Sequence, residues 1–462
     1  MHKIKGLIGD KAFYRRLVLL VLPMILQQGI SSAVNLLDNV MVGSLGTAAI
    51  SGVAIVNQFF FVFHLTIFGG LAGASIFSSQ YHGRGDVDGV RYAFRYKILF
   101  GLVVSTFAFF LFKVFGSNII GLYLNKETTS AADLAATMAM AQQYLKYLVW
   151  GTFPFIITQC FSGTLRETGN TFYPMISGII SMLVNLVFNY ILIFGKFGFP
   201  QMGVAGAALA TLLARLVETS FISLMTYYNR ADNPFIIGAF KSLKIPMDIF
   251  KNILFRGLPL LANEFIWSFS TSAVAQSYAY RGVEVLAAMN ISQTISQLFN
   301  VFFFAMGNSV AIIVGQELGA GNIEGAKDLD KKIIAFNVTV TMMVGLALAL
   351  AAPYVPHIYN TELEVRNLAT SFLFVQAFML PIYAFNHSTY FTLRAGGQTY
   401  ITFLFDSVFA ALISFPLAYF ISRHTALGII TMYMIVSGAD FIKGTIGFTF
   451  LRKGNWAKTI VL

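Results

Sequence analysis

Long apolar runs dominate the chain, and short stretches rich in glycine, proline, asparagine and charged residues separate them. A run of about 20 apolar residues is long enough to cross the hydrocarbon core of a bilayer as a helix. Twelve runs reach this length, and we expect each to form one membrane-spanning helix. Their approximate limits are 14–42, 48–78, 91–113, 133–164, 171–195, 203–228, 249–279, 284–314, 327–351, 362–392, 399–421 and 425–450.

The composition agrees with this pattern and excludes an ordinary soluble enzyme. Hydrophobic residues make up 57% of the 462 residues and charged residues only 11%, whereas about a quarter of a soluble domain is charged. The net charge of +11 does not indicate a nucleic acid partner, because the basic residues lie between the apolar runs. We therefore predict an all-α polytopic protein whose main partner is the lipid bilayer.

The basic residues also predict the topology. If alternate connections face opposite sides, 22 lysines and arginines fall on one side and 6 on the other. The side richer in Lys and Arg is normally the cytoplasmic one. This bias predicts a multi-pass protein of the inner (cytoplasmic) membrane of a cell, with both termini in the cytoplasm.

The sequence contains an internal repeat. A shift of 236 positions aligns two helical hairpins, and a shift of 228 aligns Thr164-Leu165-Arg166 with Thr392-Leu393-Arg394. The residues matched by the first shift are Leu22-Pro23 and Leu258-Pro259, Gly46 and Gly282, Gln80 and Gln316, Gly83 and Gly319, and Gly85 and Gly321.

The repeat predicts two bundles of six helices. We expect an amino-terminal lobe over residues 1–228, a cytoplasmic linker over 229–248 and a carboxyl-terminal lobe over 249–462. Because six is an even number, both copies enter the membrane in the same direction. Such repeats are related by a pseudo-two-fold axis along the membrane normal, and transport sites lie near the midplane between them.

A polar stripe follows one side of the first apolar run. It consists of Gln28, Ser31, Ser32, Asn35 and Asp38, which recur at helical spacing. A carboxylate that faced lipid would be costly, so Asp38 must face protein or a water-filled cavity. Asp38 is therefore a candidate ion or proton site; the alternative is an aspartate that only hydrogen-bonds a neighbouring helix.

A second stripe lies in the eighth run, where Asn290, Gln293, Gln297 and Asn300 share one face. Uncharged amides suit a cavity that accepts varied substrates. The shift of 236 maps three of these positions onto the second run, two of them onto Asn57 and His64. We therefore assign the substrate cavity to Gln28, Asn35, Asn57, His64, Asn290, Gln293, Gln297 and Asn300, with Tyr383 and Asn386 of the tenth run.

The six histidines are scattered, which is not the pattern of a transition-metal site. The sequence also carries no phosphate-binding P-loop, so ATP is not expected as the direct energy source. We predict no catalytic residues and no cofactor.

Several motifs in a fixed order resemble those of the multidrug and toxic compound extrusion (MATE) family, over nearly the whole chain. They are Pro23, Asp38 followed by Met41-Val42-Gly43 and Leu45-Gly46, the loop Gln80 to Asp86 with its copy Gln316 to Asn322, and the paired Leu-Arg-x-x-Gly-x-Thr loops. The resemblance implies a twelve-helix antiporter of two six-helix lobes, and we expect it to be a monomer. Such a protein exports amphipathic, often cationic compounds in exchange for Na⁺ or H⁺ by alternating access.

The resemblance also implies a cation site in the amino-terminal lobe. Its family positions correspond here to Asp38, Asn185, Asn189 and Thr211. Asn189 replaces a second carboxylate found in some members. One carboxylate with amide and hydroxyl oxygens suits Na⁺, whereas a lone buried aspartate suits a proton carrier; the two asparagines alternatively serve only to hydrogen-bond helices together.

In the carboxyl-terminal lobe, one branch of the family uses a glutamate on the seventh helix and an aspartate on the tenth. Glu264 corresponds to the glutamate, and we assign it to ion or proton coupling or, alternatively, to a structural pairing with an Asn or Trp. The tenth run has no acid at the matching place. We expect Asp406, and Asp440 with Lys443 at i, i+3, to be structural, like the i, i+3 pair of Arg215 and Glu218.

Two other functions remain open at this point. A lipid-linked oligosaccharide flippase has a related fold but would need a strongly basic central cavity. A non-transporting membrane receptor would show no substrate flux.

Overall fold

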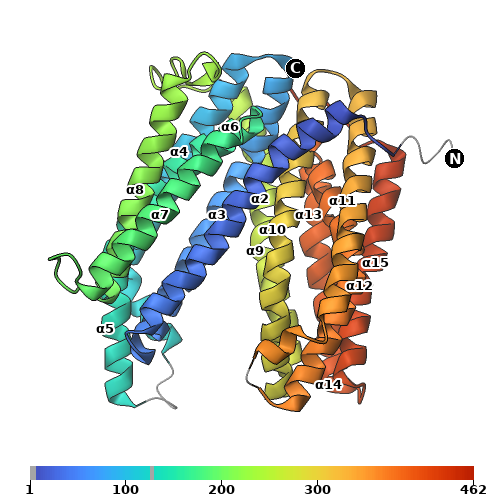
Figure 1. The fold of residues 1–462 in the computed structure, drawn as a ribbon. Helices are drawn as coiled ribbons and strands as arrows, with labels where there is room; N and C mark the ends of the chain where they lie inside the picture. Colours follow the sequence, from blue (N-terminus) through green and yellow to red (C-terminus); the bar gives the residue numbers. More distant parts are fainter. Residues whose placement is uncertain (1–6, 125–129, 360, 462) are drawn as a thin grey trace. The chain divides into compact units, whose positions relative to one another are not determined.

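The computed structural model describes residues 7–124, 130–359 and 361–461, and all regular elements in this part are helices (Figure 1). The prediction of an all-α polytopic membrane protein is confirmed. Three of the basic residues behind the predicted topology, Lys3, Lys5 and Lys126, lie outside the described residues.

The helices follow the apolar runs closely. In the first half of the chain they are α2 (Lys11–Gly43), α3 (Thr47–Arg84), α4 (Val87–Tyr123), α5 (Ala131–Leu148), α6 (Thr152–Glu167), α7 (Phe172–Phe194) and α8 (Val204–Tyr228), with short 3₁₀ turns at Val149–Gly151 and Pro234–Ile236. In the second half they are α9 (Met247–Ala279), α10 (Val283–Gly319), α11 (Ile323–Ala351), α12 (Leu363–Ala395), α13 (Thr399–Phe403), α14 (Phe415–His424) and α15 (Ile429–Lys453), with a 3₁₀ turn at Val355–Ile358.

Eleven helices in the described part are long and apolar enough to cross a membrane, where α5 with α6 and α13 with α14 each count as one. The long helix missing from this set is α9, which has 33 residues but carries Asn263, Glu264 and several serines and threonines along its length. Asn263 and Glu264 bond to polar side chains of other helices, whereas Ser270, Thr271 and Ser272 donate to carbonyl oxygens of α9 itself.

The expected helix 399–421 contains a departure from α-helical geometry. Between α13 and α14, the segments Leu404–Val408 (η4) and Ala410–Ser414 (η5) have π-helical hydrogen bonding. Each π turn widens the helix and shifts its side chains around the axis. Such bulges are frequent at functional sites, and the first of them contains Asp406.

The helices pack into two compact units, which we describe separately. The amino unit comprises Leu22–Ser78 and Val87–Ile253, and the carboxyl unit comprises Met1–Val21, Ser79–Asp86 and Leu254–Leu462. In the amino unit, α7 packs along α8; in the carboxyl unit, α12 contacts α10, α11 and α15. The limits of the two lobes and of the linker given by the repeat stay predictions.

In the carboxyl unit, the end of α3 crosses the end of α10 at two glycines. A Cβ atom at Gly83 would lie 1.8 Å from the carbonyl oxygen of Gln316, and one at Gly319 would lie 1.9 Å from the carbonyl oxygen of Gln80. The shift of 236 maps Gly83 onto Gly319 and Gln80 onto Gln316. The contact is therefore reciprocal, and only glycine allows the two backbones to approach so closely.

The carboxyl-terminal segment packs on this crossing. The Gln80 side chain donates to the carbonyl oxygens of Ala395 (2.9 Å) and Lys458 (3.2 Å) and accepts from the backbone nitrogen of Ile460 at 2.8 Å. Thr459 donates to the carbonyl oxygen of Leu318 at 2.6 Å. These bonds connect the ends of α3, α10 and α12 to the last residues of the chain.

We predict that Gly319→Ala destabilises the protein, because the added methyl group overlaps a backbone atom that no side-chain rotation can move. The expected loss is about 1–3 kcal/mol of unfolding free energy, measured by thermal or denaturant unfolding of the purified protein in detergent. Gly438→Ala is the matched control, since a Cβ atom at this position of α15 meets no atom within 4 Å. Equal stability of the two variants would contradict the crossing.

Candidate functional site

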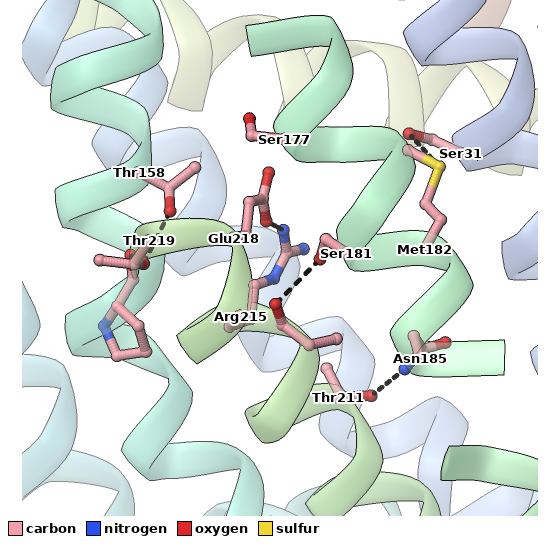
Figure 2. Close-up of polar contacts among 12 residues, drawn as sticks. Ser31, Thr158, Ser177, Ser181, Met182, Asn185, Thr211, Arg215, Glu218 and Thr219 are labelled. Carbon is pink, nitrogen blue, oxygen red and sulfur yellow. Dashed lines mark hydrogen bonds and ion pairs between the residues drawn. The ribbon is translucent and has the colours of Figure 1, made fainter. Parts of the chain in front are cut away.

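The four residues of the expected amino-lobe cation site come together in the amino unit. Asp38 lies on α2, Asn185 and Asn189 lie one turn apart on α7, and Thr211 lies on α8. The Asn189 side chain donates to Asp38 Oδ1 at 2.5 Å and to Asn185 Oδ1 at 3.2 Å. The Asn185 amide lies 3.3 Å from the Thr211 hydroxyl (Figure 2). A carboxylate, two amides and a hydroxyl therefore form one connected cluster.

The Asn185 amide can face the carboxylate in two ways. The amide atom nearest to Asp38 lies 3.0 and 2.9 Å from the two carboxylate oxygens. If this atom is the nitrogen, it donates to both oxygens, and the amide oxygen accepts from Thr211. If it is the oxygen, three oxygen atoms converge, and a proton or a cation must lie among them.

The cluster contains one further oxygen that no protein group satisfies. Asn189 is buried, and its Oδ1 atom accepts no hydrogen bond from the described residues. Buried polar atoms are rarely left without a partner. This oxygen is therefore suited to a water molecule or a hard cation, which prefers oxygen ligands.

A second polar layer continues along α7 and α8 in Figure 2. Arg215 and Glu218 form the expected i, i+3 ion pair at 2.9 Å, and the Glu218 side chain is buried. The Arg215 guanidinium also lies over the ring of Phe155, 5.2 Å from its centre. His64, expected in the substrate cavity, contacts the same ring at an interplanar angle of 34°, with the centroids 4.4 Å apart.

Most of the other expected cavity residues are exposed in their own unit. Among them, Asn57 lines a cavity of about 350 Å³ between α2 and α3. Asn39 and Gln58 line the same cavity, although the sequence did not single them out. The exposed residues are Gln28, Asn35, Asn57, Asn290, Gln293, Gln297 and Asn300.

Asn386 and Tyr383, the remaining two, lie against charged or polar neighbours within the carboxyl unit. Asn386 is buried and donates to the Asp440 side chain at 3.2 Å and to its backbone carbonyl at 3.0 Å. Tyr383 hydrogen-bonds Ser437 on the same helix as Asp440. The structure thus places these two residues in a packed polar contact between α12 and α15.

Glu264 lies on α9 and contacts α12. Tyr390 donates to Glu264 Oε1 at 3.4 Å, and the charges of Arg394 and Asp406 act on the carboxyl group. Helix α9, the seventh of the expected spans, thus contributes the Glu264 carboxyl group to a polar cluster of the carboxyl unit. Its partner from α12, the tenth expected span, is Tyr390.

The expected pairing of Lys443 with Asp440 is wrong. Lys443 instead forms an ion pair with Asp406, at 2.7 Å between its Nζ and the carboxylate Oδ1. The second oxygen of Asp406 accepts from Asn263 of α9 at 3.0 Å. An i, i+3 spacing permits a contact on one helix but does not exclude a stronger partner on another.

Two further buried polar pairs were not anticipated. In the amino unit, Lys97 forms an ion pair with Glu167 and also donates to Thr164 at 3.1 Å. In the carboxyl unit, Thr392 donates to the buried carboxyl group of Asp330 at 2.5 Å. Thr164 and Thr392 are equivalent in the repeat, so in each unit this threonine hydrogen-bonds a buried ionisable group.

No group of three or more His, Cys, Asp or Glu side chains is placed to bind a metal ion within the described residues.

The comparisons with known proteins agree with this architecture. The chain is 27% identical over 458 residues, 97% of this chain and 94% of the other, to a protein of Thermotoga maritima named "Probable multidrug resistance protein NorM". It is 23% identical over 428 residues, 91% of this chain and 89% of the other, to "Probable multidrug resistance protein YoeA" of Bacillus subtilis.

Two solved structures share the fold. A crystal structure of a variant of the Vibrio cholerae MATE transporter VcmN has a TM-score of 0.85 at 17% identity and covers 96% of this chain and 98% of its own. The outward-facing conformation of a multidrug resistance MATE family transporter has a TM-score of 0.84 at 20% identity and covers 97% of each chain. The family model described as MatE matches residues 23–191 and 259–420. The two matched segments cover most of both halves of the repeat, and the chain belongs to the MatE family.

Proposed function

We propose that this chain is a secondary antiporter that exports amphipathic, often cationic compounds in exchange for Na⁺ or H⁺ by alternating access. As a member of its family it is a multi-pass membrane transporter of small molecules and not an enzyme. The names of its curated relatives support multidrug efflux. The positive charge bias supports an inner-membrane protein with both termini in the cytoplasm, and we assign the transport activity to the monomer.

One observation carries the antiport proposal: the contact of the Asn185 amide with both oxygens of Asp38, at 3.0 and 2.9 Å. With its nitrogen inward, the amide stabilises a charged carboxylate without any bound ion. With its oxygen inward, the amide stabilises a protonated carboxyl group or adds an oxygen ligand to a cation. The same atoms therefore satisfy Asp38 both with and without its coupling ion.

The four residues provide the ligand chemistry of either ion. For Na⁺, the available oxygens are those of the Asp38 carboxylate, the Asn185 and Asn189 amides and the Thr211 hydroxyl. For H⁺, the Asp38 carboxylate is the one group of the four that binds the proton. Transport by proteoliposomes under separately imposed Na⁺ and H⁺ gradients distinguishes the two ions.

The flippase alternative receives no support from the Asp38 cluster. A pyrophosphate-linked lipid needs basic or N–H donor groups, whereas Asp38 contributes a negative charge. The receptor alternative predicts no flux, and the same proteoliposome measurement tests it.

We predict that Asp38→Asn abolishes gradient-driven export and retains part of the substrate binding. The amide keeps the shape of the side chain but removes its charge, so the site no longer exchanges an ion. An electrical gradient supplies about 2.3 kcal/mol per charge per 100 mV, and without a charged site this energy is not coupled to export. Asp88→Asn, on a side chain that is 70% exposed, is the matched control.

The measurements are uphill efflux from proteoliposomes and equilibrium binding of a fluorescent cationic substrate. Uphill export at the rate of the parent protein would refute the assignment of Asp38.

We predict that Glu264→Gln lowers transport more than it lowers stability. Glutamine keeps the hydrogen bond with Tyr390 but cannot carry a negative charge next to Arg394 and Asp406. Initial transport rates over several substrates and pH values, measured together with thermal unfolding, separate the two effects. Glu324→Gln, with a side chain that is 85% exposed, should leave both unchanged. A Glu264→Gln protein that transports like the parent under all conditions contradicts a role in coupling.

A further inference from the structure

The carboxyl unit contains a cation that belongs to the chain itself. The ammonium group of Lys443 lies 2.7 Å from Asp406 Oδ1, and the two side chains are only 13% and 16% exposed. Both residues lie in membrane-spanning helices. A buried ion pair of this kind recovers its desolvation cost only when the remaining polar atoms are also satisfied.

The surroundings of Asp406 meet this condition for its second carboxylate oxygen. Asn263 donates to Asp406 Oδ2 at 3.0 Å and accepts from the backbone nitrogen of Ser407 at 3.3 Å. Ser407 lies in the first π-helical segment, next to Asp406 itself. The Lys443 ammonium also lies over the ring of Phe405, 5.2 Å from its centre. The Asp406 carboxylate and the Phe405 ring thus contact a single cation, and the Asn263 amide holds the carboxylate in place.

A second carboxyl group is linked to Asp406 through Asn263. Glu264 directly follows Asn263 on α9 and hydrogen-bonds its side chain, and the charge of Asp406 acts on the Glu264 carboxyl group. If Lys443 were neutral, the Asp406 carboxylate would remain without its cation. A carboxylate is a hard oxygen ligand, which suits an alkali cation.

The amino unit differs at the equivalent place. Arg215 aligns with Lys443 in the repeat, but it pairs with Glu218 on its own helix. Among the described residues, Asp38 has polar contacts with two amides, Asn189 at 2.5 Å and Asn185 at 2.9 Å. In the amino unit, Asp38 is therefore available to a diffusible ion. In the carboxyl unit, Asp406 is already paired with a lysine.

We propose that Lys443 is a tethered cation that occupies the cation site at Asp406 and excludes Na⁺ from it, so that an external ion is exchanged at Asp38 alone. The proposal rests on the antiport function above and identifies Lys443 as a residue that determines ion specificity. It requires that removal of the lysine charge turns the Asp406 cluster into a Na⁺ site.

The test uses the full-length protein with Asp38→Asn as background, so that any response from the amino unit is removed. Lys443→Met is added, because methionine keeps much of the aliphatic stem but has no charge. Thermal unfolding is measured in detergent with increasing NaCl, and with KCl or choline chloride at the same ionic strength. A ligand that binds only the folded state raises the unfolding temperature with its concentration.

We expect NaCl, but not KCl or choline chloride, to raise the unfolding temperature of the variant with Lys443→Met. The background protein and the variant with Lys443→Arg should show no specific response to Na⁺. Adding Asp406→Asn to Lys443→Met should remove the response, since the carboxylate that binds Na⁺ is then absent. Lys332→Met, which removes an exposed surface ion pair with Asp328, is the control for charge removal alone.

Equal effects of NaCl and KCl on the variant with Lys443→Met would overturn the proposal. A specific Na⁺ response of the background protein that depends on Asp406 would also overturn it. If the variant is recovered folded only when NaCl is present, the proposal is supported. If the variant with Lys443→Met cannot be recovered folded in any of the salts, while the variant with both Lys443→Met and Asp406→Asn folds, Na⁺ does not replace the ammonium group and the proposal fails. The measurement needs no transport, so its failure is distinct from failure of the antiport function.

Discussion

The cost of placing a charge in hydrocarbon is the constraint on which the polar structure of this protein depends. Each charged group in a membrane-spanning helix needs a partner from the protein, because lipid supplies none. Asp38 is satisfied by amides, Asp406 by a lysine and an amide, and Glu264 by a tyrosine. These partners lie on different helices, so each of them also fixes which helices are neighbours within a unit.

The two copies of the internal repeat agree more closely in backbone geometry than in the pairing of their charged side chains. Gly83 and Gly319 occupy the same position in the crossing of α3 and α10, because any side chain there would overlap a carbonyl oxygen. Arg215 and Lys443 also occupy equivalent positions, yet one pairs within its helix and the other across helices. A close backbone contact tolerates one residue type, whereas a long basic side chain can reach several different acids.

The sequence predicts the helices well because apolar length alone determines whether a segment can span a bilayer. The cluster of Asp38, Asn185, Asn189 and Thr211 was predicted from the resemblance to a family, and only the placement of the two asparagines follows from helical spacing. The pairing of Lys443 with Asp406 was not predictable in this way. Asp406 lies in a π-helical segment, and hydrophobic periodicity carries no signal for such a segment.

The contrast between the two units has a consequence for energy coupling. An aspartate surrounded by neutral amides changes its charge when an ion arrives, so the membrane potential acts on that step with about 2.3 kcal/mol per charge per 100 mV. An ion pair of an aspartate and a lysine has no net charge, and this stays so throughout the cycle while the two side chains remain in contact. On this assignment Asp38 exchanges the charge, and the pair of Asp406 and Lys443 holds Glu264 in a fixed electrostatic environment. One diffusible ion per cycle is then the stoichiometry that the two units together support.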